Sequence, residues 1–157
     1  MHRERGMSGP ARKETSEERS RMVTYARQII QNSPNQALTD DTVLVECIEA
    51  CFDCAQACTA CADACLGEGD PAGLVKCIRD DLDCADICVA AGKVLSRQAQ
   101  PSVAVTRAAL EACAASCKQC GDTCAEHAEH HEHCRVCMEA CRQCEVACNN
   151  VLSALAA

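Results

Sequence analysis

Aromatic residues are almost missing from this sequence of 157 residues. They make up 1% of the chain, with one tyrosine, one phenylalanine and no tryptophan. A chain of this length is long enough to bury a real core, so side chains other than large rings must fill it. Proline and glycine, which interrupt helices, are also scarce at 4 and 7 residues. These absences favour long helices packed through smaller side chains.

Targeting and membrane-spanning segments are missing as well. The first 21 residues are polar and charged throughout, without the apolar core of a signal peptide, and Arg3 and Arg5 are not adjacent as in a twin-arginine signal. No apolar stretch is long enough to span a bilayer. The net charge of -8 argues against binding to nucleic acid. We therefore expect a cytoplasmic protein with neither a membrane nor a nucleic acid as partner.

Cysteine, by contrast, occurs 18 times. Between Cys47 and Cys65 the steps from one cysteine to the next are 4, 3, 4, 3 and 4 residues. This spacing keeps the side chains on one face of an α-helix, at the a and d positions of a heptad. A helix normally carries leucine, isoleucine or valine on that face, so here thiols replace hydrocarbon along a whole stripe.

Three further segments carry cysteines at similar spacing and end at capping or breaking residues. Asp40 begins the first cysteine helix, which we expect to end at Gly67-Glu68-Gly69. Asp70-Pro71 begins the second, which we expect to run to about Gln98. Ser102 begins the third, and the last follows a turn within residues 130–133. We predict an all-α fold in which residues 39–157 form an antiparallel four-helix bundle with a cysteine-lined core. Residues 1–15 are expected to be a disordered tail. Residues 16–33 are expected to form an extra amphipathic helix, which lacks cysteine and packs outside the bundle or at an oligomer contact.

The two ends of such a bundle differ in chemistry. Extending the cysteine stripes in one direction reaches apolar residues that form what we call the plug: Leu44, Ala91, Leu95, Val103, Leu110, Val151 and Leu155. The opposite end, which we call the mouth, holds Cys65, Cys77, Cys124 and Cys134, together with His127, His131, His133 and the nearby Met138. We place His127 and His131 on the continued stripe of the third cysteine helix. Because the plug offers no ligand, we expect metal ions to pass through the mouth.

Asp81 interrupts the cysteine pattern of the second helix. It occupies an a position between Cys77 and Cys84, where an apolar side chain or a thiol is expected. We expect its carboxylate to face water at a helix edge, and an oxygen ligand inside the bundle is the alternative.

Several roles of cysteine fit this pattern poorly. One or two buried thiols act as small apolar side chains, but 18 on one surface exceed that role. Pairs three or four residues apart on one helix are badly placed for a disulfide. A thioredoxin-like protein needs one C-x-x-C beside a sheet, whereas this sequence has five such pairs within helices. The C-x-x-C-x-x-C spacing of bacterial ferredoxins, in which three cysteines follow one another at steps of three residues, does not occur either.

Metal binding remains, and thiolate ligands select soft ions such as Cu(I) or Zn(II). A zinc ion with four thiolates carries a charge of −2, so several sites would bury a large negative charge in a core without cations. Cu(I) replaces one proton per thiolate, which keeps a one-to-one array neutral. Multiple Cu(I) ions therefore fit better. The candidate ligands are Cys47, Cys51, Cys54, Cys58, Cys61, Cys65, Cys77, Cys84, Cys88, Cys113, Cys117, Cys120, Cys124, Cys134, Cys137, Cys141, Cys144, Cys148, His127, His131 and His133.

The repeated C-x-x-x-C pairs resemble those of the bacterial copper storage proteins over residues 40–155. The pairs are Cys47/Cys51, Cys54/Cys58, Cys61/Cys65, Cys84/Cys88, Cys113/Cys117, Cys120/Cys124, Cys137/Cys141 and Cys144/Cys148. The resemblance, which is to the cytosolic branch, implies a homotetramer of four-helix bundles that store Cu(I) and are not enzymes. A copper chaperone or a small copper ligand is the expected partner. The methionine-rich mouth of exported members is absent, which favours uptake through histidines.

Two classes of function follow. The first is storage or detoxification of many Cu(I) ions, and the second is a zinc buffer or a thiol redox protein. Capacity for Cu(I) separates them.

Overall fold

The computed structural model describes residues 24–156. In this part of the chain the elements are α2 (Tyr25–Gln31), α3 (Asp41–Leu66), the 3-10 helix η1 (Pro71–Leu74), α4 (Val75–Leu95), α5 (Val103–His127) and α6 (Glu132–Ala154). No strand occurs among the described residues, and the all-α prediction is confirmed. The predictions for the tail 1–15 and for residues 16–23 of the first helix lie outside the described residues.

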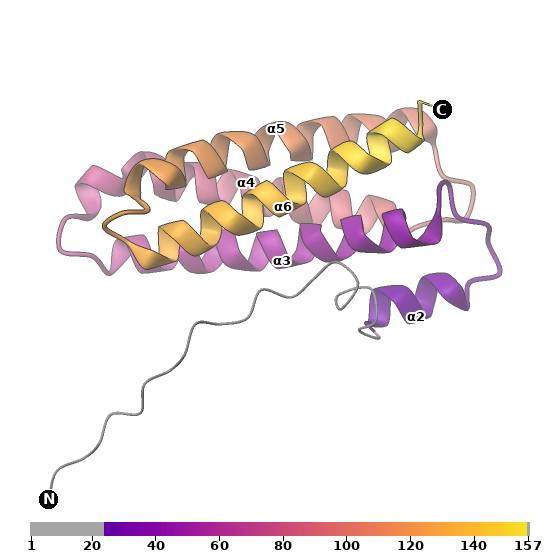
Figure 1. Ribbon diagram of the computed structural model, residues 1–157, viewed down its shortest axis with the longest axis horizontal. Coiled ribbons are helices and arrows are strands. Elements are labelled where there is room, and N and C mark those ends of the chain that lie inside the picture. Colours follow the sequence, from indigo (N-terminus) through magenta and orange to yellow (C-terminus); the bar gives the residue numbers. More distant parts are fainter. Residues whose placement is uncertain (1–23, 157) are drawn as a thin grey trace, which may run out of the picture.

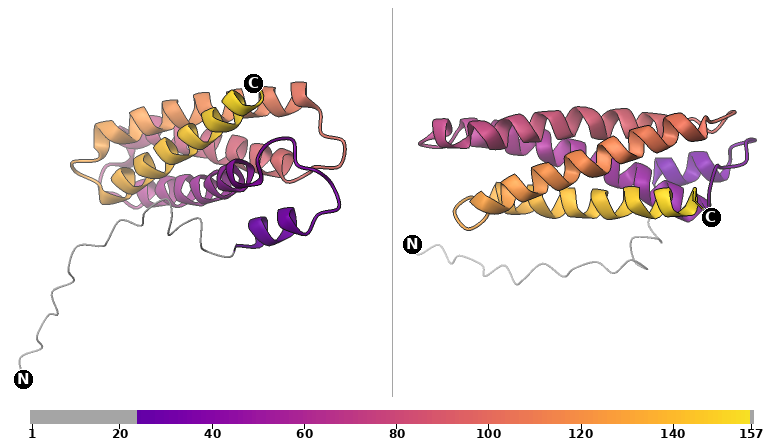
Figure 2. Two further views of the ribbon diagram at one scale, coloured as in Figure 1. Left: turned by 45° about the vertical axis from the view of Figure 1, so that its right-hand side comes forward. Right: turned by 90° about the horizontal axis from the view of Figure 1, so that it is seen from above.

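The four long helices form the predicted antiparallel bundle. Each of them packs against two others. Helix α3 packs against α4 and α6, and α5 also packs against α4 and α6. The links after α3 and α5 lie together at one end of the bundle, and the α4–α5 link lies with the end of α6 at the other (Figure 1). Two further views show the same side-by-side arrangement (Figure 2). None of the helices within residues 24–156 is both long and apolar enough to cross a bilayer.

Capping residues place the ends of these helices where the sequence indicates. The Asp40 side chain accepts hydrogen bonds from the backbone N–H groups of Thr42 and Val43, and the Ser102 hydroxyl accepts one from Val105. Such side chains satisfy backbone donors that the first helical turn leaves unpaired. Helix α3 ends at Leu66 with Gly67 as its C-cap residue, which agrees with the predicted end.

The second cysteine helix departs from the prediction at both of its ends. Pro71 begins a 3-10 turn, the α-helix proper starts only at Val75, and the Asp70 side chain makes no capping hydrogen bond. The helix also ends at Leu95 and does not reach Gln98. Instead, the buried Gln98 side chain donates to the Leu95 carbonyl over 2.7 Å and accepts from the Leu38 N–H over 2.8 Å. This amide therefore ties the end of α4 to the segment before α3.

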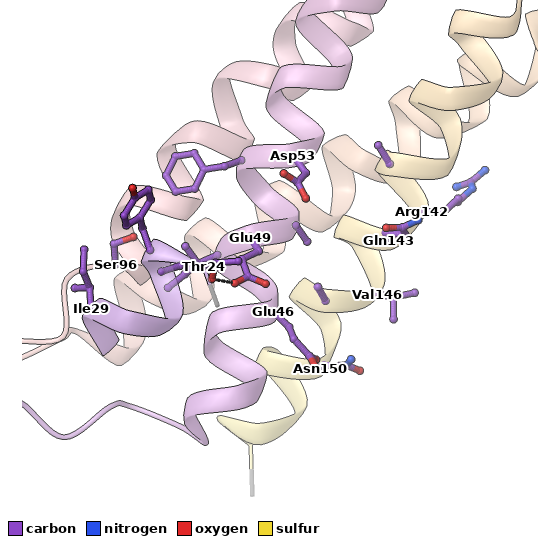
Figure 3. A pocket seen from close by; sticks show the side chains of 17 residues that line it. Thr24, Ile29, Glu46, Glu49, Asp53, Ser96, Arg142, Gln143, Val146 and Asn150 are labelled. Carbon is purple, nitrogen blue, oxygen red and sulfur yellow. Dashed lines mark hydrogen bonds between the residues drawn. The ribbon is translucent and has the colours of Figure 1, made fainter. Parts of the chain in front are cut away.

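Helix α2 packs on the outer face of α3, outside the four-helix bundle. The Thr24 side chain caps it and donates a hydrogen bond to Glu49 of α3, and Ile30 is buried against the bundle. Figure 3 shows the Thr24–Glu49 pair at the side of a groove of about 1040 Å³ between α2, α3 and α6. Ile29 and Val146 also line this groove and are largely exposed, so the groove presents an apolar surface.

Apolar side chains close the end of the bundle at which α3 and α5 begin. Leu44, Leu95, Leu110 and Val151 are each exposed by 1% or less. Burial of such a side chain contributes about 1.5–3 kcal/mol to folding, so the plug is a substantial part of the core. Val103 was expected there but is 45% exposed. Val103 is the first residue of α5, and this end of the helix lies beyond the packed interior.

Candidate metal centre

All 18 cysteines lie inside the bundle, none exposed by more than 2%. Every one of them falls within the described residues, and every one is a free thiol. Helix α3 contributes six of them, α4 three, α5 four and α6 five. The predicted cysteine-lined core is therefore confirmed. The cysteine stripes of the four helices face one another, and sulfur takes the place of a hydrocarbon core.

Neighbouring sulfur atoms meet across helices at nearly uniform distances. Cys88 Sγ of α4 lies 3.5 Å from Cys117 Sγ and 3.6 Å from Cys113 Sγ, both on α5. Cys58 Sγ of α3 lies 3.6 Å from Cys141 Sγ of α6. With a metal–sulfur bond of about 2.3 Å, the sulfurs of a trigonal site are about 4 Å apart and those of a tetrahedral site about 3.8 Å. The thiols are thus spaced to share metal ions with little movement.

Sets of four sulfur atoms, all within 4.8 Å of one another, follow the axis of the bundle. Five of these sets are Cys51/Cys113/Cys144/Cys148, Cys54/Cys84/Cys88/Cys117, Cys54/Cys58/Cys84/Cys141, Cys58/Cys120/Cys137/Cys141 and Cys61/Cys65/Cys77/Cys134. Cys54, Cys58, Cys84 and Cys141 each belong to two of them. Shared ligands indicate a continuous array with bridging thiolates, which separate four-ligand zinc sites would not require.

Asp81 lies inside this array, and the expectation that it faces water was wrong. Its side chain is fully buried, and Oδ1 accepts from the thiols of Cys120 at 3.0 Å and of Cys124 and Cys137 at 3.3 Å. Burial is the main cause that raises the Asp81 pKa to about 8. The carboxyl group therefore keeps its proton at neutral pH, which avoids an unpaired buried charge. No lysine or arginine is buried in the described part of the chain.

Two thiols at the mouth, those of Cys65 and Cys134, are also protonated at neutral pH. Burial raises the pKa of Cys65 to about 11 and likewise raises the pKa of Cys134. A metal ion that binds these sulfurs must displace their protons, since the thiolate is the form that coordinates.

Histidines at the start of α6 lie beside the thiols of the mouth. His133 Nδ1 lies 3.4 Å from Cys61 Sγ and 3.5 Å from Cys134 Sγ, and its Nε2 lies 3.0 Å from Glu68 Oε1. The same Glu68 oxygen lies 3.0 Å from His131 Nδ1. The hydrogen bond from His133 is the largest cause that lowers the Glu68 pKa, so Glu68 is a carboxylate at neutral pH. His133 thus carries a nitrogen donor directly to the thiol array.

The other two predicted histidines are placed less directly. Helix α5 ends at His127, which is half-buried at the mouth. We expected His131 to continue the stripe of α5, but this was wrong. His131 is the N-cap residue of α6. Met138 packs against the core as a partly buried side chain. Of the three histidines, only His133 makes hydrogen bonds to thiols within residues 24–156.

Comparison with known proteins agrees with this geometry. The family model described as copper storage protein matches residues 40–153, which is most of the chain and the whole cysteine-rich bundle. The chain belongs to the copper storage protein family. A search of curated proteins finds no match.

Solved structures from Streptomyces lividans are similar to this member of the family. The copper storage protein Ccsp loaded with 10 copper equivalents is 53% identical, with a TM-score of 0.80 over 82% of this chain and 98% of that one. A cytosolic copper storage protein with five coppers is 60% identical, with a TM-score of 0.70 over 71% of this chain and 92% of that one. A Ccsp variant with two histidines replaced by alanine is 57% identical, with a TM-score of 0.73 over 74% of this chain and 98% of that one.

Two features of the site were missed or misjudged at the level of sequence. Glu68 lies between two glycines, and we took Gly67-Glu68-Gly69 only as the end of a helix. The heptad position of Asp81 points inward, but we expected its carboxylate to face water at a helix edge. An ionised carboxylate is costly to bury. The raised pKa of Asp81 means that the side chain is buried as the neutral acid at pH 7, and holding this proton, which the unfolded chain does not bind at that pH, costs free energy.

Proposed function

We propose that this chain stores many Cu(I) ions as thiolate complexes inside its four-helix bundle. One observation carries the proposal: 18 buried free thiols form overlapping four-sulfur sets along one axis. Since each Cu(I) replaces one proton, a filled array stays neutral in a core without lysine or arginine. Membership in the family and the copper-loaded neighbours support the same assignment.

The ligands in this proposal are the 18 cysteines, with the mouth histidines His127, His131 and His133 as uptake ligands. The approach of His133 Nδ1 to two thiols supports a transfer from imidazole to the array. The plug offers an incoming ion only apolar side chains and a large desolvation cost. Copper therefore enters and leaves at the mouth.

Storage or detoxification, without catalysis, is the role that this chemistry favours. Filling the core with metal leaves the thiols buried and out of reach of a substrate. We also place the protein in the cytosol, as one Streptomyces lividans neighbour is named. A copper chaperone or a small copper ligand would deliver the ion to the mouth, because free Cu(I) is not expected to be available in the cytosol.

We further propose that the chain forms a homo-oligomer, with a tetramer as the expected state. The groove between α2, α3 and α6 supports this, since Tyr25, Ile29, Phe52 and Val146 are exposed along it. Sedimentation velocity of the apo protein tests the state. A purely monomeric species at micromolar concentration would contradict it.

An anaerobic titration of the reduced apo protein with Cu(I) tests the storage function. A colorimetric Cu(I) chelator reports the end point as the first copper that the protein no longer retains. We expect close to one Cu(I) per cysteine, about 18 per chain, and release of about one proton per ion because free thiols titrate near pH 8.5. A parallel Zn(II) titration is the matched control. Saturation at four or five ions for both metals would contradict copper storage and support a zinc buffer.

A further inference from the structure

The turn between α3 and η1 places one carboxylate against two histidines. Glu68 follows Gly67, the C-cap residue of α3, and its side chain reaches the start of α6, 65 residues further along the chain. A single oxygen, Oε1, lies 3.0 Å from Nδ1 of His131 and 3.0 Å from Nε2 of His133. The two rings lie 5.4 Å apart between centroids and are tilted by 33°. Glu68 therefore contacts different ring nitrogens on histidines that are two residues apart.

This contact determines where each neutral imidazole carries its proton. An ionised carboxylate only accepts hydrogen bonds, so each nitrogen that faces Glu68 must bear the hydrogen. His133 is then protonated on Nε2, which leaves the lone pair of Nδ1 free. His131 is protonated on Nδ1, which leaves the lone pair of Nε2 free. The Nε2–H form prevails in free histidine, so His131 is held in its less common tautomer.

The free nitrogen of His133 is the one that matters for the array. Nδ1 faces the thiols of Cys61 and Cys134 at 3.4 and 3.5 Å, and these sulfurs are 3.9 Å from each other. The three atoms form a triangle in which a Cu(I) ion can accept one nitrogen and two sulfurs. A proton on Nδ1 would remove the nitrogen from this set. Partners that fix the tautomer of a ligating histidine commonly change metal affinity by roughly 10–100-fold.

We propose that Glu68 is a positioning residue that sets opposite tautomers on His131 and His133 and so keeps His133 Nδ1 available to Cu(I) beside Cys61 and Cys134. The proposal rests on the copper-storage function for its role, but its structural part concerns the apo protein alone. Within residues 24–156, the Glu68 side chain makes no hydrogen bond to a thiol and bonds to the two histidines instead. It acts through the two imidazoles, in the way that a carboxylate orients a histidine ligand at many metal sites.

The tautomers can be measured directly in the full-length apo protein. Long-range proton–nitrogen NMR of protein labelled with nitrogen-15 in histidine distinguishes the two forms and is recorded at about pH 8. We expect Nδ1–H on His131 and Nε2–H on His133 in the wild type. In Glu68→Ala we expect His131 to revert to Nε2–H. The matched control is Glu129→Ala, an exposed glutamate of the same connection that makes no hydrogen bond within the described residues, and it should resemble the wild type.

A Cu(I) chelator competition then measures affinity for the first ion bound. In Glu68→Ala we expect it to fall by roughly 10-fold or more, with total capacity unchanged. Identical tautomers in Glu68→Ala and wild type would overturn the proposal, and so would a changed tautomer with unchanged affinity for the first ion. Failure of the wild type to bind many Cu(I) ions would instead refute the storage function, while the NMR result would still decide whether Glu68 sets the tautomers.

Discussion

The buried carboxyl group of Asp81 makes the stability of the apo protein depend on pH in an unusual direction. The perturbation that isolates it is Asp81→Asn, which keeps the shape and cannot ionise. The carboxyl group is fully buried, and its raised pKa of about 8 has burial as the main cause. The groups that face it are all thiols, namely Cys61 of α3, Cys77 of α4, Cys120 and Cys124 of α5, and Cys137 of α6.

The sign follows from the protons bound in each state. An aspartate in the unfolded chain titrates near pH 3.9, so between about pH 4 and 8 the folded protein holds one proton more than the unfolded chain. Stability therefore falls as pH rises through this window, by at most about 1.4 kcal/mol per pH unit. From pH 5 to 7 the loss is up to about 3 kcal/mol, which is large beside a typical stability of about 5–15 kcal/mol.

Surface carboxylates act in a different window. Lys118 and then Arg142 lower the pKa of Asp122 to about 2. A lowered pKa contributes stability that is present above the unfolded value and is lost as pH falls through the folded value. That contribution is already complete at pH 5, so it adds no slope between pH 5 and 7.

Urea unfolding of the reduced apo protein at pH 5, 6 and 7, followed by far-ultraviolet circular dichroism, measures the effect. We expect the free energy of unfolding of the wild type to fall across this range and that of Asp81→Asn to change much less. Asp86→Asn, an exposed site on the same helix, should retain the slope of the wild type. Equal slopes for the wild type and Asp81→Asn would refute the reasoning.

Three further predictions concern the apo fold, the mouth and the plug. Apo protein should give the circular dichroism of a helical protein, because the helices have caps and protonated thiols pack as apolar groups; a random-coil spectrum would make copper a folding cofactor. Replacing His127 and His131 together by Phe should slow both Cu(I) uptake and chelator-driven removal in stopped-flow traces while leaving capacity unchanged. His130→Phe, at an exposed position, is the control, and equal rates in all three proteins would place uptake elsewhere. Leu110→Ala should lower the free energy of unfolding by about 2–5 kcal/mol, whereas Leu82→Ala, at a side chain 46% exposed, should change it by less than about 1 kcal/mol. Equal losses for the two would show that the plug is not packed as described.

Local spacing was enough to predict the helices and their inward faces. Steps of three and four residues act within a single helix, so they place every cysteine on one side whatever the helix later packs against. The same is true of the caps at Asp40 and Ser102, whose side chains bond to backbone groups two or three residues away. The cysteine-lined core and the leucine plug could therefore be predicted from sequence alone.

Only the tertiary structure decided which groups meet across helices. Cys54 and Cys141 are 87 residues apart in sequence, yet their sulfur atoms lie 3.8 Å apart. Their meeting depends on the register between α3 and α6, which no local period fixes. The path of two separate turns likewise brings Glu68 to the histidines of α6. The protonated state of Asp81 depends on burial by all four helices, since desolvation arises only when the whole bundle has closed around the carboxyl group.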